Sequence, residues 1–313
     1  MMLEFRQYLL EPRVWTRLPA DWREIFGRDA KLAVEIGFGN GEFLAEEAGR
    51  CPDWDFVGFE VSLKCIEKAG RKLAQAGVRN VRLVLLDGRF GLRELFPDGS
   101  VERVIANFPC PWPKARHAGR RLVREDFPRT LGAVLREGGR FELTSDHLPF
   151  LEEAREALEG CGCFVLEGPS PVEGVPRTRY ERKWRLRGLE IRRLVARKVK
   201  GTGVERIAEG TMPHVHVPKE LSPEEILRVR GLKEVWPEGS FVVKEGYISP
   251  DGGEVLLRAH ATDRGFHQHY FILVHREKDG WMVKLDGASL PFRTPAVKRS
   301  VAAVGEYLLR KGG

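Results

Sequence analysis

The chain has 313 residues, 42% of them hydrophobic and 31% charged, which predicts a folded protein of two domains and excludes a disordered one. No apolar run approaches the roughly 20 residues that cross a bilayer, and the N-terminus lacks a signal segment, so we expect neither a membrane protein nor a secreted one. The net charge is +7, and because residues 177–200 alone carry +9, the basic residues are concentrated and indicate a polyanionic partner.

Short apolar runs alternate with amphipathic stretches from residue 31 onward. Strands that alternate with helices of this length predict a parallel, doubly wound α/β sheet. The expected strands are 31–36, 56–60, 81–86, 101–107 and 140–145. The expected helices are 42–49, 63–76, 128–136 and 150–159.

The pattern changes after about residue 200, where prolines punctuate the chain and β-like runs joined by turn signals follow. We expect a small α+β domain there, and we divide the chain into domains 1–200 and 201–313. The expected strands are 241–248, 254–261, 269–276 and 281–285, and the expected helices are 224–229 and 296–309.

A glycine-rich turn, with Gly37, Gly39 and Gly41, lies where the first strand meets the first helix, and Glu35 precedes it. Glycines let the backbone turn sharply and approach a ligand closely. In the dehydrogenase fingerprint the third glycine comes one residue later, and the ligand there is a pyrophosphate. An acid before the turn suits a positively charged amino-acid group better than a phosphate.

Two further acids end the next strands. Glu60 ends the second strand, where a carboxylate can accept hydrogen bonds from both ribose hydroxyls, and Asp87 follows the third strand, close to an expected adenine. Together with Glu35, they favour S-adenosylmethionine, which carries a sulfonium and an ammonium group but no phosphate.

The segment 107–114 reads Asn-Phe-Pro-Cys-Pro-Trp-Pro-Lys and follows the fourth strand. Its three prolines stiffen a loop at the edge where open α/β sheets bind ligands. Because four basic residues follow closely, we expect a substrate platform. They are Arg116, His117, Arg120 and Arg121.

With these motifs the sequence resembles the bacterial tRNA (guanine-N7)-methyltransferases over about residues 22 to 187. The Phe-Pro-x-Pro-Trp-x-Lys loop is the most specific match. The other matching segments are 35–41, 58–61, 80–82 with Asp87, 138–139, 144–146 and 178–181.

The resemblance implies a class I, Rossmann-like methyltransferase fold, S-adenosylmethionine as donor, and transfer to N7 of the guanine at position 46 in the variable loop of tRNA. Since N7 has an in-plane lone pair and no proton, the reaction needs alignment and charge compensation rather than a general base. Asp146 and Glu181 are the candidate catalytic acids, joined by the Thr178 hydroxyl in binding the guanine. The resemblance assigns Asn107 to the cofactor, and Lys114, Arg116, His117, Arg120 and Arg121 to the substrate.

One residue departs from the family pattern. The family's loop usually carries an Asp, a candidate active-site acid, where this chain has Cys110, and a thiol is only a weak hydrogen-bonding group. Either that acid is dispensable, or Asp146 and Glu181 carry more of the task, or the substrate differs. Cys110 stays among the candidate catalytic residues by its position, although N7 transfer needs no cysteine nucleophile.

Two other functions stay open at this point: a class I RNA methyltransferase acting on another base, and a non-catalytic RNA-binding homologue. The sequence leaves open whether the protein is a monomer or a homodimer. Five cysteines do not make a disulfide framework, so we expect a reduced, cytoplasmic protein, and only three Asn and three Gln residues indicate a thermophile. We expect no metal, and interpret His214-x-His216 and His267-x-His269 as polar strand faces, because no cysteine lies nearby.

Overall fold

The computed structural model describes residues 5–124 and 126–310, without the side chains of residues 115, 118 and 120. The chain forms two compact units. The first comprises Met1–Pro12 and Arg17–Glu205, and the second comprises Arg13–Thr16 and Arg206–Gly313. The chain thus passes to the second unit after Glu205, whereas the change in composition placed the division at residue 200.

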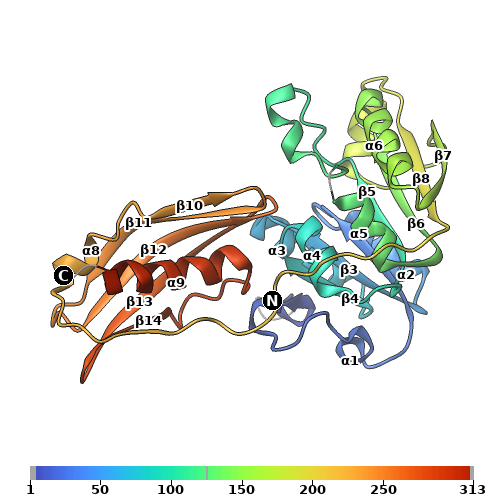
Figure 1. The fold of residues 1–313 in the computed structure, drawn as a ribbon. Coiled ribbons are helices and arrows are strands. Elements are labelled where there is room, and N and C mark those ends of the chain that lie inside the picture. Colours follow the sequence, from blue (N-terminus) through green and yellow to red (C-terminus); the bar gives the residue numbers. More distant parts are fainter. Residues whose placement is uncertain (1–4, 125, 311–313) are drawn as a thin grey trace. The chain divides into compact units, whose positions relative to one another are not determined.

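The first unit is built on an eight-stranded sheet in the order β1-β4-β3-β2-β5-β6-β8-β7 (Figure 1). Neighbouring strands from β1 to β6 are parallel, and β8 runs antiparallel to both β6 and β7. Strand order reverses between β2 and β5, which is where doubly wound sheets bind ligands. The strands are β1 (Leu9–Leu10), β2 (Lys31–Ile36), β3 (Trp54–Glu60), β4 (Val81–Leu85), β5 (Val101–Asn107), β6 (Leu135–Ser145), β7 (Phe164–Pro171) and β8 (Arg192–Lys198).

Helices cover both faces of this sheet. Phe56 and Phe59 of β3 point to opposite faces, because successive side chains of a strand alternate. Phe56 packs in a cluster with residues of α2 and α3, while Phe59 lies against Gly91 of α4. The helices are α1 (Trp22–Phe26), α2 (Glu42–Arg50), α3 (Leu63–Gln75), α4 (Gly88–Leu95), α5 (Phe127–Val134), α6 (Leu148–Cys161) and α7 (Arg179–Leu186), with short 3-10 helices η1 (Arg6–Tyr8), η2 (Pro12–Val14) and η3 (Ala115–Arg120).

The expected α/β alternation is confirmed, but several element bounds in the first unit differ and some elements were not expected. The expected helix 128–136 ends at Val134, and β6 begins at Leu135 instead of residue 140, since Leu135 already pairs with Val101. The sequence also did not predict α1, α4, α7, β1, β7 or β8. In β8, buried Leu194 and Ala196 alternate with Arg193, Val195 and Arg197, so positive charge and an apolar Val195 concealed the period-two pattern.

The second unit is a six-stranded antiparallel sheet in the order β10-β11-β12-β13-β14-β9, which confirms the expected α+β architecture. Its strands are β9 (Val215–Val217), β10 (Lys233–Trp236), β11 (Gly239–Ile248), β12 (Glu254–Asp263), β13 (Phe266–Glu277) and β14 (Gly280–Leu285), and its helices are α8 (Pro223–Leu227) and α9 (Pro295–Arg310).

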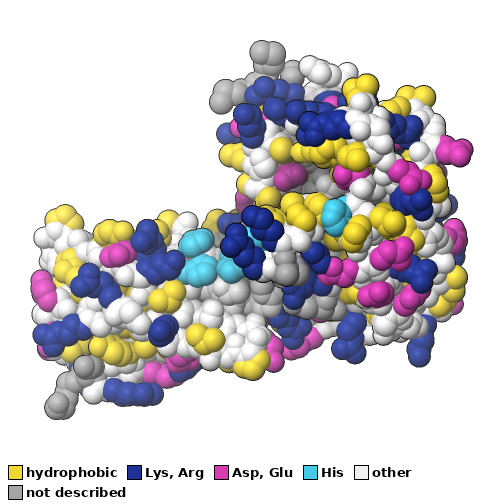
Figure 2. Space-filling model, turned by 90° about the horizontal axis from the view of Figure 1, so that it is seen from above, with side chains coloured by type: hydrophobic (Ala, Val, Ile, Leu, Met, Phe, Trp, Pro, Cys, Tyr) yellow, Lys and Arg dark blue, Asp and Glu magenta, His cyan; other side chains and the backbone are white. Residues whose placement is uncertain are grey.

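Helix α9 covers one face of this second sheet, where Leu257, Ile272 and Val304 belong to one buried cluster. The opposite face bears polar side chains, among them His260, whose ring centroid lies 5.4 Å from that of His267 and 4.6 Å from that of His269. Figure 2 shows histidine side chains gathered at the surface. The expectation of polar strand faces therefore describes this region well.

No helix within residues 5–124 and 126–310 has the length and apolarity needed to span a bilayer. All five cysteines are free thiols.

Candidate active site

The carboxyl ends of the parallel strands bring the predicted site segments to one edge of the first sheet. The glycine turn follows β2, Glu60 ends β3, Asp87 follows β4, and the proline-rich loop follows β5. Asn107 pairs with Thr144, and the Phe108 N–H donates to the Thr144 carbonyl at 2.8 Å. The proline-rich loop therefore begins beside the end of β6. Asp146 directly follows that end.

The glycine turn has the backbone that its composition predicts. Gly37, Gly39 and Gly41 have φ values of 72°, 57° and 70°, in the left-handed region that favours glycine. A Cβ on Gly41 would lie 2.6 Å from that of Ala69, so this glycine lets α2 approach α3. A Cβ on Gly37 or Gly39 would meet no protein atom within 4 Å, so the turn leaves space in which a ligand can approach the backbone.

Glu35 is 2% exposed, and only one of its two carboxylate oxygens is hydrogen-bonded. Asn107 Nδ2 donates to Oε1 at 3.2 Å, while Oε2 is buried without a partner. Burial raises the pKa of Glu35 to about 8. The ammonium group of S-adenosylmethionine would supply the missing donor, so the residues present fit this cofactor.

Glu60 joins the glycine turn to the segment after β3. Its Oε2 accepts from the Gly39 N–H at 3.1 Å, and its Oε1 accepts from Val61 and Ser62 at 2.8 and 3.1 Å. A carboxylate has about four acceptor positions, so ribose hydroxyls would have to share this group with the backbone. Asp87 Oδ1 caps α4 by accepting from the N–H groups of Arg89 and Phe90.

The proline-rich loop holds two non-glycine residues in left-handed backbone, Phe108 at φ 53° and Trp112 at φ 42°. Such conformations are strained and persist only where the surroundings enforce them. Arg121 provides part of that enforcement, because Nε and Nη2 donate to the carbonyls of Pro111 and Trp112 at 3.0 and 3.1 Å, and Nη1 pairs with Glu153 of α6. Arg121, expected to bind substrate, therefore holds the loop.

The other residues assigned to the substrate lie at the surface near this loop. Lys114 and Arg116 are exposed, and Arg116 Nε lies 3.2 Å from Nε2 of His117. The ring centroid of His117 is 5.7 Å from that of Trp112. Arg120 lies in η3, and its side chain is outside the described residues. Cys110 is exposed, with its thiol free.

Thr178 and Glu181 form the start of α7. Thr178 Oγ1 accepts from the Glu181 N–H at 3.0 Å, and Glu181 Oε2 accepts in return from the Arg177 N–H at 2.9 Å. Glu181 is 5% exposed, and its Oε1 also pairs with Arg185 at 2.7 Å. Both oxygens of Glu181 are therefore occupied, whereas the Thr178 hydroxyl keeps its hydrogen for a ligand.

The start of α7 lies close to the proline-rich loop, since the ring centroids of Phe108 and Tyr180 are 6.4 Å apart. Asp146 is half-buried and forms no hydrogen bond or ion pair within the described part of the chain. The structure thus brings the loop and α7 together, and it leaves Asp146 with an uncommitted carboxylate.

A buried ion-pair network that the sequence did not predict lies beside Glu35. Arg103 of β5 pairs with Glu47 of α2 at 2.5 Å and with Glu142 of β6 at 2.7 Å, and Arg177 also pairs with Glu47. Burial by itself would raise the pKa of Glu47. The hydrogen bond from Arg177 and the charge of Arg103 outweigh this effect, so the pKa of Glu47 is lowered. No local sequence signal reveals this network, because its members lie on α2, β5, β6 and the segment before α7.

Much of the basic run 177–200 is neutralised within the fold. Six of its arginines pair with acids: Arg177, Arg182, Arg185, Arg192, Arg193 and Arg197. Arg179, Lys183 and Arg187 remain exposed, with no ion pair to the rest of the described chain. Lys183 Nζ and Arg187 Cζ lie 4.4 and 5.2 Å from the Trp184 ring centroid, so this patch combines positive charge with an aromatic ring.

Comparisons with known proteins agree with this geometry. Residues 29–194 match a family model described as "Putative methyltransferase". The chain is 45% identical to the tRNA (guanine-N(7)-)-methyltransferase of Thermotoga maritima over 310 residues, 98% of each chain. It is 33% identical to the protein of that name from Thermus thermophilus over 306 residues, 97% of each chain. The chain belongs to the tRNA (guanine-N(7)-)-methyltransferase family.

Proposed function

We propose that this protein transfers a methyl group from S-adenosylmethionine to N7 of a guanine in tRNA, and that this guanine is at position 46 in the variable loop. The observation that carries the proposal is the buried Glu35 carboxylate, whose Oε2 lacks a partner beside an open glycine turn. This arrangement suits a nucleotide cofactor that bears a cation. Family membership supports the same donor and acceptor.

The residues around β2 and β3 would hold the cofactor, which when bound supplies a methyl group on positively charged sulfur. Glu35 would bind the ammonium group, and the space at Gly37 and Gly39 would admit the amino-acid portion close to the backbone. Glu60, at the end of β3, would accept hydrogen bonds from the ribose hydroxyls.

The chain's task toward the guanine is alignment and charge compensation. N7 attacks through a lone pair, and a positive charge develops on the base, so a nearby carboxylate lowers the barrier. Asp146 suits this role because its carboxylate is uncommitted, and it can accept from the guanine N1–H and amino group. Thr178 donates its hydroxyl hydrogen, while Glu181 positions Thr178 by fixing the start of α7.

Exposed cations on two segments would bind the tRNA backbone. We assign this role to Arg179, Lys183 and Arg187 of the α7 region, together with Lys114 and Arg116 after the proline-rich loop, because these groups are exposed and form no ion pair within the described residues. A cytoplasmic location fits a tRNA substrate and five free thiols.

The test is incubation with methyl-labelled S-adenosylmethionine and unmodified tRNA, followed by identification of the labelled nucleoside. We expect label in 7-methylguanosine, and none in a matched tRNA in which adenine replaces guanine 46. Label on adenine or cytosine would favour the alternative RNA methyltransferase. Absence of label despite cofactor binding would favour a non-catalytic RNA-binding protein.

A further inference from the structure

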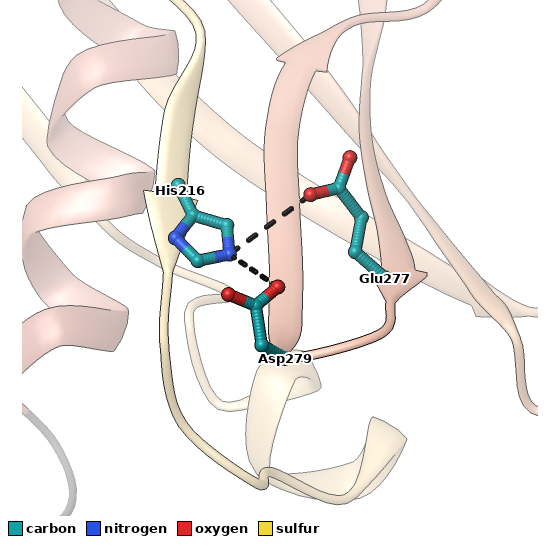
Figure 3. Close-up of side chains that lie close together, drawn as sticks. All are labelled: His216, Glu277 and Asp279. Atoms are coloured by element: carbon teal, nitrogen blue, oxygen red, sulfur yellow. Dashed lines mark hydrogen bonds and ion pairs between the residues drawn. The ribbon is translucent and has the colours of Figure 1, made fainter.

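A cluster of one imidazole and two carboxylates lies on the second sheet (Figure 3). His216 comes from β9, Glu277 ends β13, and Asp279 lies in the turn to β14. His216 Nε2 is 3.2 Å from Asp279 Oδ1 and 3.9 Å from Glu277 Oε2. One ligand atom from each residue lies within 4.8 Å of the others.

The backbone ladder of the sheet fixes these positions. His275 pairs with Met282, and Met282 pairs with His216, so three strands place these side chains in one row. Glu277 lies two residues after His275 and therefore on the same face. His275 Nε2 is 3.9 Å from Glu277 Oε1, the oxygen that does not face His216.

We propose that His216, Glu277 and Asp279 bind a divalent transition-metal ion of the Zn²⁺ type. Imidazole nitrogen with carboxylate oxygen is a donor set that favours Zn²⁺, Co²⁺ or Ni²⁺ over Mg²⁺ or Ca²⁺. Ligands about 2.0–2.2 Å from a tetrahedral ion stand about 3.4 Å apart, close to the 3.2 and 3.9 Å that separate His216 Nε2 from the two carboxylates. Water completes the coordination, and His275 positions Glu277.

The ion would stabilise the edge strand β9 of the second sheet. Strand β9 has three residues at the end of the sheet order, and among the described strands it pairs with β14 alone. A metal held by His216 and the β13–β14 turn would add a cross-link between segments some sixty residues apart, and would stabilise the folded unit.

The test titrates Co²⁺, followed by visible absorption, and Zn²⁺, followed by calorimetry, into the full-length protein after treatment with a chelator. We expect one saturable site in the native protein and at least a tenfold loss of affinity in His216→Ala. His214→Ala removes the exposed neighbouring imidazole of the same motif and should bind as the native protein does. Zn²⁺ should raise the unfolding temperature of the native protein and His214→Ala, but not of His216→Ala.

The proposal would be overturned by no saturable binding, by unchanged affinity in His216→Ala, or by loss of binding in His267→Ala instead, which would place the ion at the stacked histidines. Circular dichroism checks that His216→Ala is folded. Asp279→Asn serves as a second variant, because this side chain is 76% exposed and its replacement leaves the core untouched. It too should lose at least tenfold in affinity, and unchanged binding would contradict the assignment.

Discussion

Glu35 should couple cofactor binding to the release of a proton. Burial raises its pKa from 4.5 to about 8; the Asn107 bond and the charges of Arg103 and Arg177 oppose that rise, and Glu47 adds to it. The folded-state pKa lies above the unfolded value. Between about pH 4.5 and 8 the folded protein therefore keeps a proton that the unfolded chain has already lost. The free energy of unfolding contributed by this group therefore falls as pH rises through that window.

Binding of an ammonium group should convert Glu35 from the neutral acid to the carboxylate. Calorimetry of S-adenosylmethionine binding at pH 7, in buffers of different ionisation enthalpy, should show release of about one proton per cofactor. Glu35→Gln has no proton to release and should show buffer-independent enthalpies. The same independence in the native protein would contradict a neutral Glu35.

Asp146 and Cys110 occupy neighbouring segments but differ in hydrogen-bonding capacity. Loss of a hydrogen bond to a charged group costs about 1.5–3 kcal/mol, so Asp146→Ala should lower kcat by about ten- to a hundredfold. Cys110→Ala should change it by less than about threefold, because a thiol is a weak partner. Single-turnover rates for both folded variants check this, and abolition of transfer in Cys110→Ala alone would reverse the two assignments.

At the scale of elements, Glu60 connects the end of β3 to the turn before α2. Glu60→Ala removes both the ribose acceptor and the bond to the Gly39 N–H, so the dissociation constant of S-adenosylmethionine should rise at least tenfold. The tRNA dissociation constant of the variant should differ from that of the native protein by less than about twofold, since Glu60 is not one of the residues assigned to the tRNA backbone. Calorimetry and tRNA filter binding measure the two separately, and unchanged cofactor affinity would refute the role.

Arg121 and Lys114 offer a matched pair for separating loop support from RNA binding. Arg121→Ala releases two carbonyls of a strained loop, so it should lower kcat more than it weakens tRNA binding. Lys114→Ala removes an exposed cation and should mainly raise the tRNA dissociation constant. If Arg121→Ala changed only tRNA affinity, the arginine would be a substrate ligand, as the sequence resemblance implied.

At the scale of the whole molecule, the two units differ in charge. Residues 203–313 contain 16 basic and 15 acidic residues, so this region should release few counterions on binding RNA. Truncation after residue 205 should therefore preserve methylation at moderate temperature and the slope of log Kd against log salt concentration. It should lose activity sooner on heating, because Arg13–Thr16 belongs to the second unit and would lose its packing partners.

Initial rates and tRNA affinity measured against temperature and salt, for the full and truncated chains, check these expectations. A truncated chain that is folded and heat-stable but no longer binds tRNA would show that the second unit binds RNA.

The sequence by itself determined the doubly wound sheet, the glycine turn and the acids at its strand ends. These features depend on local periodicity and on residues such as Gly37 and Gly41, whose backbone conformation few other residues adopt. Only the tertiary structure decided which charged side chains are available to bind a ligand. Arg121 looks like a ligand in the sequence, yet Pro111, Trp112 and Glu153 bind it in the fold. Glu181 is bonded to Arg177 and Arg185 at the start of its own helix, while Asp146 forms no hydrogen bond or ion pair within the described residues. The same holds for His216, whose carboxylate partners lie some sixty residues away, because strand pairing rather than sequence spacing sets which side chains meet.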